Sequence, residues 1–197
     1  MPVFAKKDKS ILFIHVPKAG GSSIEKLATQ LGWSEIFSIR GKSLNDIHYC
    51  KASLQHLHAA VLQEIFHFSE FDSIFTIVRH PFARMKSEYY WQVTQKLTNH
   101  RVSEWIELAF SRFQEDPFVY DNHIRPQVEF VPPYDYANVF KVEEDGVNHS
   151  RQIFDALSEK KCKRRFLERL YRRLAQNEIV EKKSVKDVRT EADFKKN

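Results

Sequence analysis

The residue types best suited to chemistry gather in a short glycine-containing loop near the start of the chain. Residues 17–23 read Pro-Lys-Ala-Gly-Gly-Ser-Ser, and they hold two of the five glycines among 197 residues. Glycine lets the backbone approach a ligand closely and aim its N–H groups inward. A helix predicted to begin at Ser22 adds free N–H groups and the positive end of its dipole, and Lys18 adds a mobile charge. These features predict a phosphate or sulfate site, with an ordinary glycine-rich turn as the alternative.

A second candidate site for an anion follows at Arg79. Arg79 ends a predicted strand, Ser87 lies eight residues further on in the next predicted helix, and Arg84 stands between them. A guanidinium at a strand end and a hydroxyl two turns into the next helix can hold one phosphate from two sides. An exposed arginine and a helical serine without a shared ligand would show the same spacing, so this pair alone is a weak signal.

Neither site has the features of a metal-dependent nucleotide site. The loop at 17–23 lacks the G-x-x-x-x-G-K-[ST] spacing of the nucleoside triphosphate loop, because its lysine precedes the glycines. No acidic residue stands in a clear position for Mg²⁺, and Cys50 and Cys162 lack metal-ligand spacing. We therefore assign no residue to a metal.

The two motifs in this order resemble one family of enzymes. A strand, the run PKAGGSS and a helix, followed by a strand, R-x-P-x-x-R-x-x-S and a helix, resemble the sulfotransferases that use PAPS (3′-phosphoadenosine 5′-phosphosulfate). The similarity covers about residues 11–142 and is closest to the Golgi carbohydrate O-sulfotransferases and their bacterial relatives, the family 2 group. It implies PAPS as donor, PAP (adenosine 3′,5′-bisphosphate) as product, no metal, and a carbohydrate hydroxyl as acceptor.

The resemblance also assigns the donor-binding residues. It implies that the 3′-phosphate is held by Arg79 and Ser87. The 5′-phosphosulfate would be held by the loop residues Lys18, Ala19, Gly20, Gly21, Ser22 and Ser23. A mid-chain segment, residues 122–127, is similar to the family's segment near the acceptor and the nucleotide.

Sulfuryl transfer by in-line displacement needs a base for the acceptor hydroxyl and a cation for the leaving oxygen. Lys18 suits the second task, and a histidine that titrates near neutrality suits the first. Similar sulfotransferases carry an H-x-x-A segment whose histidine is the base, which implies His56 in His56-Leu57-His58-Ala59. His58 is the rival and His123 the next candidate, whereas His15 is expected to be structural.

The elements that must position these residues alternate between strands and helices. Continuous apolar runs predict buried strands at 11–16 and 73–78, and a third strand is expected at 138–142. Helices are expected at 22–31, 59–66, 82–97 and 102–113. A capping box of Ser22 and Glu25 would begin the first helix. This order predicts an α/β, P-loop-like, three-layer fold with a mainly parallel central sheet flanked by helices.

Length and charge favour a single sulfotransferase domain over residues 1–197, with 150–197 a basic helical segment. Residues 1–158 hold 17 Lys and Arg against 19 Asp and Glu, whereas residues 159–197 hold 14 against 7, so the charge of +5 originates in the C-terminal part. The tail helix would pack on the domain, follow an anionic glycan or touch a membrane surface. We expect no nucleic-acid partner.

No apolar run approaches the roughly 20 residues of a membrane span, no signal-peptide core is visible, and two cysteines do not make a disulfide framework. A cytoplasmic protein is therefore expected. Two functions compete with sulfuryl transfer. One is a nucleotide-dependent small-molecule kinase, and the other is a non-catalytic protein that binds an anion or nucleotide.

Overall fold

Five strands form one sheet in the order β3-β1-β2-β4-β5. The computed structural model describes residues 3–38, 49–133 and 136–159, which belong to one unit, residues 1–160. The predicted tail helix lies outside the described residues from position 160 onward. The strands are β1 (Val3–Lys6), β2 (Lys9–Ile14), β3 (Ser34–Ile36), β4 (Ser73–Val78) and β5 (Asn138–Lys141).

The sheet is mixed, because β2, β4 and β5 run parallel while β1 is antiparallel to both β2 and β3. The expected mainly parallel sheet is therefore only half parallel. The three strands predicted from the sequence, which correspond to β2, β4 and β5, form the parallel half. Lys7 adopts a left-handed φ of 56° and closes the two-residue turn between β1 and β2. Such turns usually carry glycine or asparagine, so Lys7-Asp8 gave no hairpin signal.

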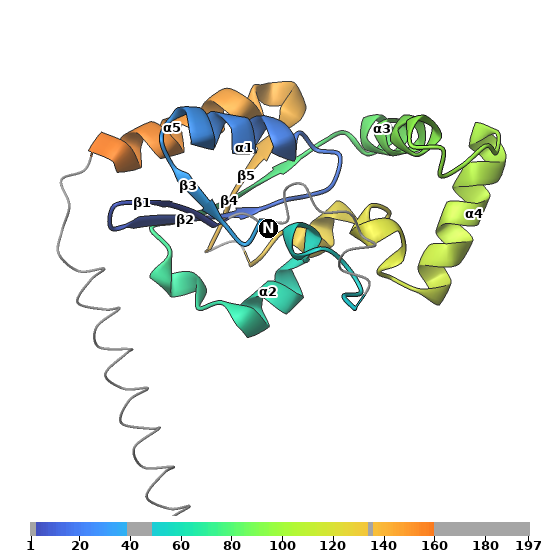
Figure 1. The fold of residues 1–197 in the computed structure, drawn as a ribbon, viewed down its shortest axis with the longest axis horizontal. Coiled ribbons are helices and arrows are strands. Elements are labelled where there is room, and N and C mark those ends of the chain that lie inside the picture. Colours follow the sequence, from blue (N-terminus) through green and yellow to red (C-terminus); the bar gives the residue numbers. More distant parts are fainter. Residues whose placement is uncertain (1–2, 39–48, 134–135, 160–197) are drawn as a thin grey trace, which may run out of the picture. The chain divides into compact units, whose positions relative to one another are not determined.

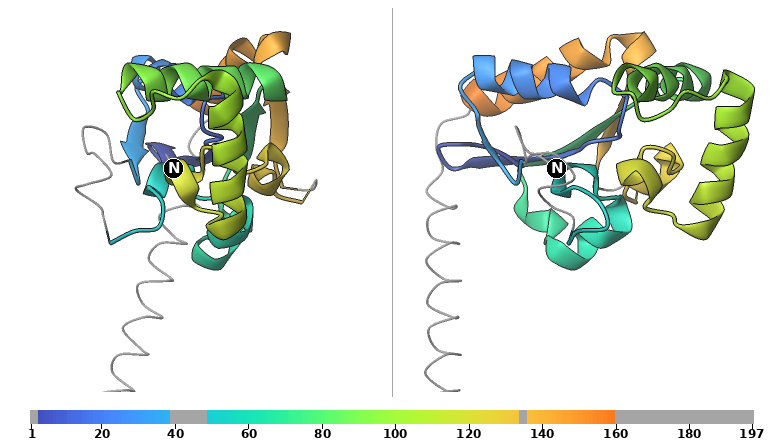
Figure 2. Two further views of the ribbon diagram at one scale, coloured as in Figure 1. Left: turned by 90° about the vertical axis from the view of Figure 1, so that its right-hand side faces the viewer. Right: turned by 45° about the vertical axis from the view of Figure 1, so that its right-hand side comes forward.

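Helices cover both faces of this sheet. Figures 1 and 2 show α1 (Gly21–Gln30) and α5 (Gly146–Glu159) side by side over one face, with α2 (Ala59–Ile65) on the other. Residues of β2 alternate between the two sides: Ile11 and Phe13 pack under α1 and α5, and Leu12 and Ile14 pack toward α2. Burial on both faces explains the continuous apolar run in β2.

Two further helices extend the domain beyond the carboxyl ends of the parallel strands (Figure 1). They are α3 (Pro81–Thr94) and α4 (Val102–Glu115), and a small core forms around Trp105, Ala109 and Ile124. Short 3-10 turns connect the remaining elements. The helices expected at 22–31, 59–66, 82–97 and 102–113 are present, with ends that differ by up to three residues. No described helix is long and apolar enough to cross a bilayer.

The start of α1 differs from the sequence expectation. Its N-cap is Gly20 in a left-handed conformation, φ 88° and ψ 15°, and no side chain caps the helix. The capping box of Ser22 and Glu25 is therefore wrong. The carboxylate of Glu25 instead faces the β2 strand end, where its Oε1 lies 3.2 Å from Nδ1 of His15. His15 is buried, and a buried polar group needs a partner in the core. Glu25 therefore faces His15 rather than capping the helix.

Candidate functional site

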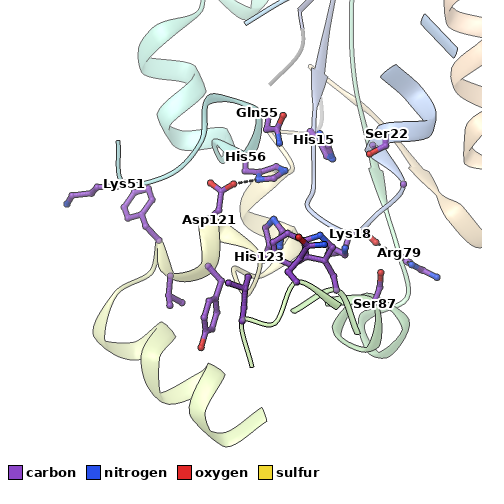
Figure 3. A pocket seen from close by; sticks show the side chains of 18 of the residues that line it. His15, Lys18, Ser22, Lys51, Gln55, His56, Arg79, Ser87, Asp121 and His123 are labelled. Atoms are coloured by element: carbon purple, nitrogen blue, oxygen red, sulfur yellow. Dashed lines mark hydrogen bonds and ion pairs between the residues drawn. The ribbon is translucent and has the colours of Figure 1, made fainter. Parts of the chain in front are cut away.

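The carboxyl ends of β2 and β4 open into a cleft of about 1180 Å³. This is the place where open α/β sheets bind ligands. Most of the residues singled out in the sequence meet here (Figure 3). Those that line the cleft are Lys18, Gly20, Gly21, Ser22, His56, Arg79, Ser87 and His123. Ala19 is buried beneath the loop and Ser23 is exposed, and neither lines the cleft.

The loop after β2 depends on glycine at two positions. Gly20 has a φ of 88°, a conformation that residues with a side chain seldom adopt. Gly21 has no room for a side chain, because a Cβ there would lie 1.9 Å from Nε2 of His15. The backbone thus turns tightly into α1, whose first N–H groups have no partner within the helix. This arrangement can hold an anion.

Arg79 and Lys18 bring two cations to the same end of the cleft. The Nη1 of Arg79 donates to the carbonyl oxygen of Lys18 at 3.4 Å. The side chain of Gln127 fixes the Arg79 backbone on both sides, with N–H to Oε1 at 2.9 Å and Nε2 to carbonyl oxygen at 2.8 Å. The Nζ of Lys18 lies 5.1 Å from the Trp91 ring centroid. Burial lowers the pKa of Lys18, which Glu88 partly offsets.

Arg84 is buried, and its guanidinium binds the backbone rather than a ligand. Its guanidinium donates to the carbonyl oxygens of Pro17 at 2.9 Å, Arg125 at 3.0 Å and His123 at 2.6 Å. Burial lowers its pKa to about 10, with Glu88 acting in the opposite direction, so Arg84 stays charged. The second arginine of the R-x-P-x-x-R-x-x-S motif therefore joins the glycine loop to residues 123–125.

His56 is buried against a carboxylate. Its Nδ1 lies 2.6 Å from Oδ2 of Asp121, which also accepts from the hydroxyl of Ser53 at 2.8 Å. Asn122 donates to the carbonyl oxygen of His56 at 2.8 Å. Burial lowers the pKa of His56 to about 3 despite the hydrogen bond to Asp121, so this imidazole is neutral at ordinary pH. Burial alone would raise the pKa of Asp121, but the bonds from His56 and Ser53 lower it.

A second imidazole–carboxylate pair stands opposite. The Nδ1 of His123 lies 2.6 Å from Oε2 of Glu88, a fully buried residue of α3. Gln92 donates to Oε1 of Glu88 at 2.8 Å and accepts from Nε1 of Trp105 at 2.9 Å. Burial alone would raise the pKa of Glu88, but the hydrogen bond from His123 lowers it. The chain of bonds fixes His123 in one orientation.

Aromatic contacts join these groups along one wall of the cleft. Ring centroids lie 5.0 Å apart for His15 and His56, 4.9 Å for His56 and His123, and 5.3 Å for His123 and Trp91. His15, expected to be structural, supports the loop through Gly21 and also lines the cleft. The rings therefore form a continuous wall from His15, beside the glycine loop, to Trp91, beside the Nζ of Lys18.

Comparison with known proteins gives one match. The model of the sulfotransferase family, of the family 2 type, matches residues 1–193. The chain belongs to this family. No curated protein and no solved structure matches it. Sulfuryl transfer is the general chemistry of this family.

Within this sulfotransferase, the two rival histidines differ in position. His56 lines the cleft, whereas His58 is not found among its described lining residues. His58 is the N-cap of α2, and its ring centroid lies 5.8 Å from that of Phe118. Burial and then Arg125 lower the pKa of His58. The fold thus separates the two histidines by position, because only His56 is among the described residues that line the cleft.

Asp121 and Glu88 are the residues that sequence reasoning missed in this sulfotransferase. Tyr120, Asp121 and Asn122 have φ values of 49°, 57° and 63°, and three successive left-handed residues store strain that is common at functional sites. This turn aims Asp121 at His56. The segment 122–127, which is similar to the family's mid-chain segment, begins one residue after Asp121 and does not include Glu88.

His56, Asp121 and His123 also hold potential metal ligands within 4.8 Å of one another. Imidazole and carboxylate suit Zn²⁺. However, the Nδ1 atom of each histidine already faces a carboxylate, and Asp121 lies on the Nδ1 side of His56, away from its Nε2. The contacts account for the cluster as two imidazole–carboxylate pairs, and no metal follows from it.

Replacing Gly21 with alanine should destabilise the sulfotransferase through His15. The new Cβ would overlap the imidazole, so we expect a loss of about 1–3 kcal/mol in the free energy of unfolding. Adding His15→Ala should recover most of this loss in urea unfolding. As a control, Gly32→Ala has positive φ but only Lys6 Nζ at 3.9 Å, so His15→Ala should not rescue it. A double variant that is as unstable as Gly21→Ala alone would contradict the contact.

Removing the His56 imidazole should flatten the acid side of the stability curve. The pKa of His56 is about 3 in the folded chain against 6.5 ordinarily, so the unfolded chain binds this proton first. The contribution of the neutral His56 to the free energy of unfolding is fully present above its ordinary pKa of 6.5. It is lost as the pH falls toward the folded-state pKa, by at most about 1.4 kcal/mol per pH unit.

Urea unfolding between about pH 4.5 and pH 7 compares wild type with His56→Gln. His58→Gln is the matched control, because the pKa of His58 is also lowered but this side chain is only half-buried. We expect a smaller change of slope for the control. Identical slopes in wild type and His56→Gln would refute the buried neutral imidazole.

Proposed function

We propose that this sulfotransferase moves the sulfuryl group of PAPS to a hydroxyl of a carbohydrate. One observation carries the proposal: the anion-binding loop after β2 and the imidazole–carboxylate pair of His56 open into the same cleft. Two requirements of the reaction, a place for the donor and a base for the acceptor, are thus met within one cavity. The loop and α1 act as a P-loop-like element.

The donor would lie along the ends of β2 and β4. Backbone N–H groups of the loop, together with Lys18, suit the 5′-phosphosulfate. Arg79 and Ser87 suit the 3′-phosphate, because both line the cleft on the α3 side of the loop. Gln127 fixes the backbone of Arg79 through two hydrogen bonds.

The proposed reaction is an in-line displacement at sulfur. The acceptor oxygen attacks sulfur, its proton passes to Nε2 of His56, and the bond between sulfur and the 5′-phosphate oxygen breaks. Lys18 and the loop N–H groups stabilise the charge on the leaving phosphate. Asp121 holds the proton of Nδ1 and stabilises the imidazolium that forms.

The rest of the cleft favours a sugar as acceptor. Its volume exceeds what one small molecule usually needs, so donor and acceptor have room together. The lining beyond His56 combines aromatic rings with polar groups: Lys51, Gln55, Trp91, Asp116, Phe118 and Tyr120. Flat apolar faces beside hydrogen-bonding groups suit the two kinds of surface that a sugar ring presents.

PAP should bind without a divalent metal and raise the melting temperature, because Lys18, Arg79 and backbone N–H groups meet its charges. ATP with Mg²⁺ should have little effect. Thermal unfolding with each ligand, with EDTA in the PAP sample, measures this. Stabilisation by ATP–Mg²⁺ alone would favour a kinase, and stabilisation by neither would favour the non-catalytic alternative.

Arg79→Ala should weaken PAP by about 1.5–3 kcal/mol, the value of a charge-assisted hydrogen bond. Binding of adenosine 5′-phosphate, which lacks the 3′-phosphate, should change little. Titration calorimetry with both nucleotides compares the losses. Lys86→Ala, a change on the exposed face of α3, the helix that follows Arg79, is the control. Equal losses for both nucleotides would remove Arg79 from the 3′ site.

His56→Ala should reduce turnover by about 10²–10⁴-fold with nearly unchanged PAP affinity. His58→Ala should do much less, because it lies outside the cleft. Initial rates at saturating PAPS compare the two variants, so that donor binding cannot mask a chemical effect. The opposite ranking would make His58 the base.

A further inference from the structure

Two imidazole–carboxylate pairs face each other in the cleft, and the proposed reaction uses one of them. His56 is held by Asp121 and His123 by Glu88, with Nδ1 to carboxylate distances of 2.6 Å in both. The two rings lie 4.9 Å apart at 72°, and a ring nitrogen of each lies within 4.8 Å of the other. Both histidines line the cleft.

The carboxylates decide which nitrogen of each ring meets a ligand. The pKa values of Asp121 and Glu88 are lowered, so both are ionised and accept the Nδ1 proton of their histidine. A neutral imidazole then presents its lone pair at Nε2. Within the described parts of the chain, neither Nε2 has a hydrogen-bond partner. With both Nδ1 atoms facing carboxylates, Nε2 is the nitrogen of each ring that is left for a ligand.

The pair of His123 and Glu88 has more hydrogen bonds than a packing role would need. Glu88 is fully buried, and burying a carboxylate costs several kcal/mol unless it is paired and bonded. Gln92 and Trp105 extend its support into α4, while Arg84 holds the carbonyl oxygen of His123. The result of this network is one fixed direction for Nε2 of His123.

We propose that the acceptor carries two adjacent hydroxyls, and that His123 recognises the one that does not react. His56 takes the proton of the reacting hydroxyl, and Nε2 of His123 accepts a hydrogen bond from its neighbour. The centroids of the two rings lie only 4.9 Å apart, so neighbouring hydroxyls on one sugar ring can each direct a hydrogen bond of about 2.8 Å to a different imidazole. His123 is therefore a specificity-determining residue for a vicinal diol, an inference that rests on the proposed function.

Histidine ¹⁵N NMR tests this without turnover. The probes are trans-1,2-cyclohexanediol and its monomethyl ether, each added to the full chain with and without PAP. The diol should shift the Nε2 signals of His56 and His123 together, whereas the ether should shift only one. Equal responses to both probes, or a diol that shifts fewer than two signals, would overturn the proposal.

His123→Asn supplies the matched variant. Its amide N–H can replace the Nδ1 donor to Glu88, but nothing replaces Nε2, so the buried carboxylate keeps a partner. Wild type should bind the diol about 3–10-fold more tightly than the ether, the value of one neutral hydrogen bond. His123→Asn should bind both equally. A preference that persists in His123→Asn would overturn the role of His123.

Two controls separate this inference from the proposed function. Circular dichroism of His123→Asn checks that this variant folds. PAP binding, read from the same samples by its own chemical-shift changes, tests the donor independently. Absent PAP binding with intact diol recognition would contradict the donor, and intact PAP binding without diol recognition would contradict the inference.

Discussion

The site depends on one buried cation, the guanidinium of Arg84. Its three hydrogen bonds join Pro17 before the glycine loop, α3 on which it sits, and the backbone of His123 and Arg125. An arginine in the core is tolerated only when its donors are satisfied. Here the carbonyl groups of two irregular segments supply that need, and the same bonds fix the donor loop and the imidazole wall relative to each other.

The electrostatics of the cleft centre on the neutral imidazole of His56 and two buried carboxylates. Asp121 and Glu88 have neighbours that keep them ionised, and Glu88 also partly offsets the lowering of the Lys18 pKa by burial. His15 and His123 both lower the pKa of His56. A proton that His56 gains during a reaction has Asp121 as its counter-charge.

Local patterns in the sequence predicted most of the elements and several of the residues that line one end of the cleft. Apolar runs located β2 and β4, and the glycine and arginine motifs located the residues at their carboxyl ends, since both signals span a few positions. The β1 hairpin, the Gly20 cap and the left-handed turn at 120–122 left no such signal. The partners His56–Asp121 and Glu88–His123 are 65 and 35 residues apart, and only the fold brings them together.

The long reach of Arg84 has a consequence for the order of folding. Its bonds span 67, 41 and 39 residues, so each closes a long loop before it contributes stability. Contacts of this kind slow folding and form late. On a ribosome, the helices and the β1–β2 hairpin can form early. The cleft, in contrast, can form only after the chain beyond Arg125 has emerged.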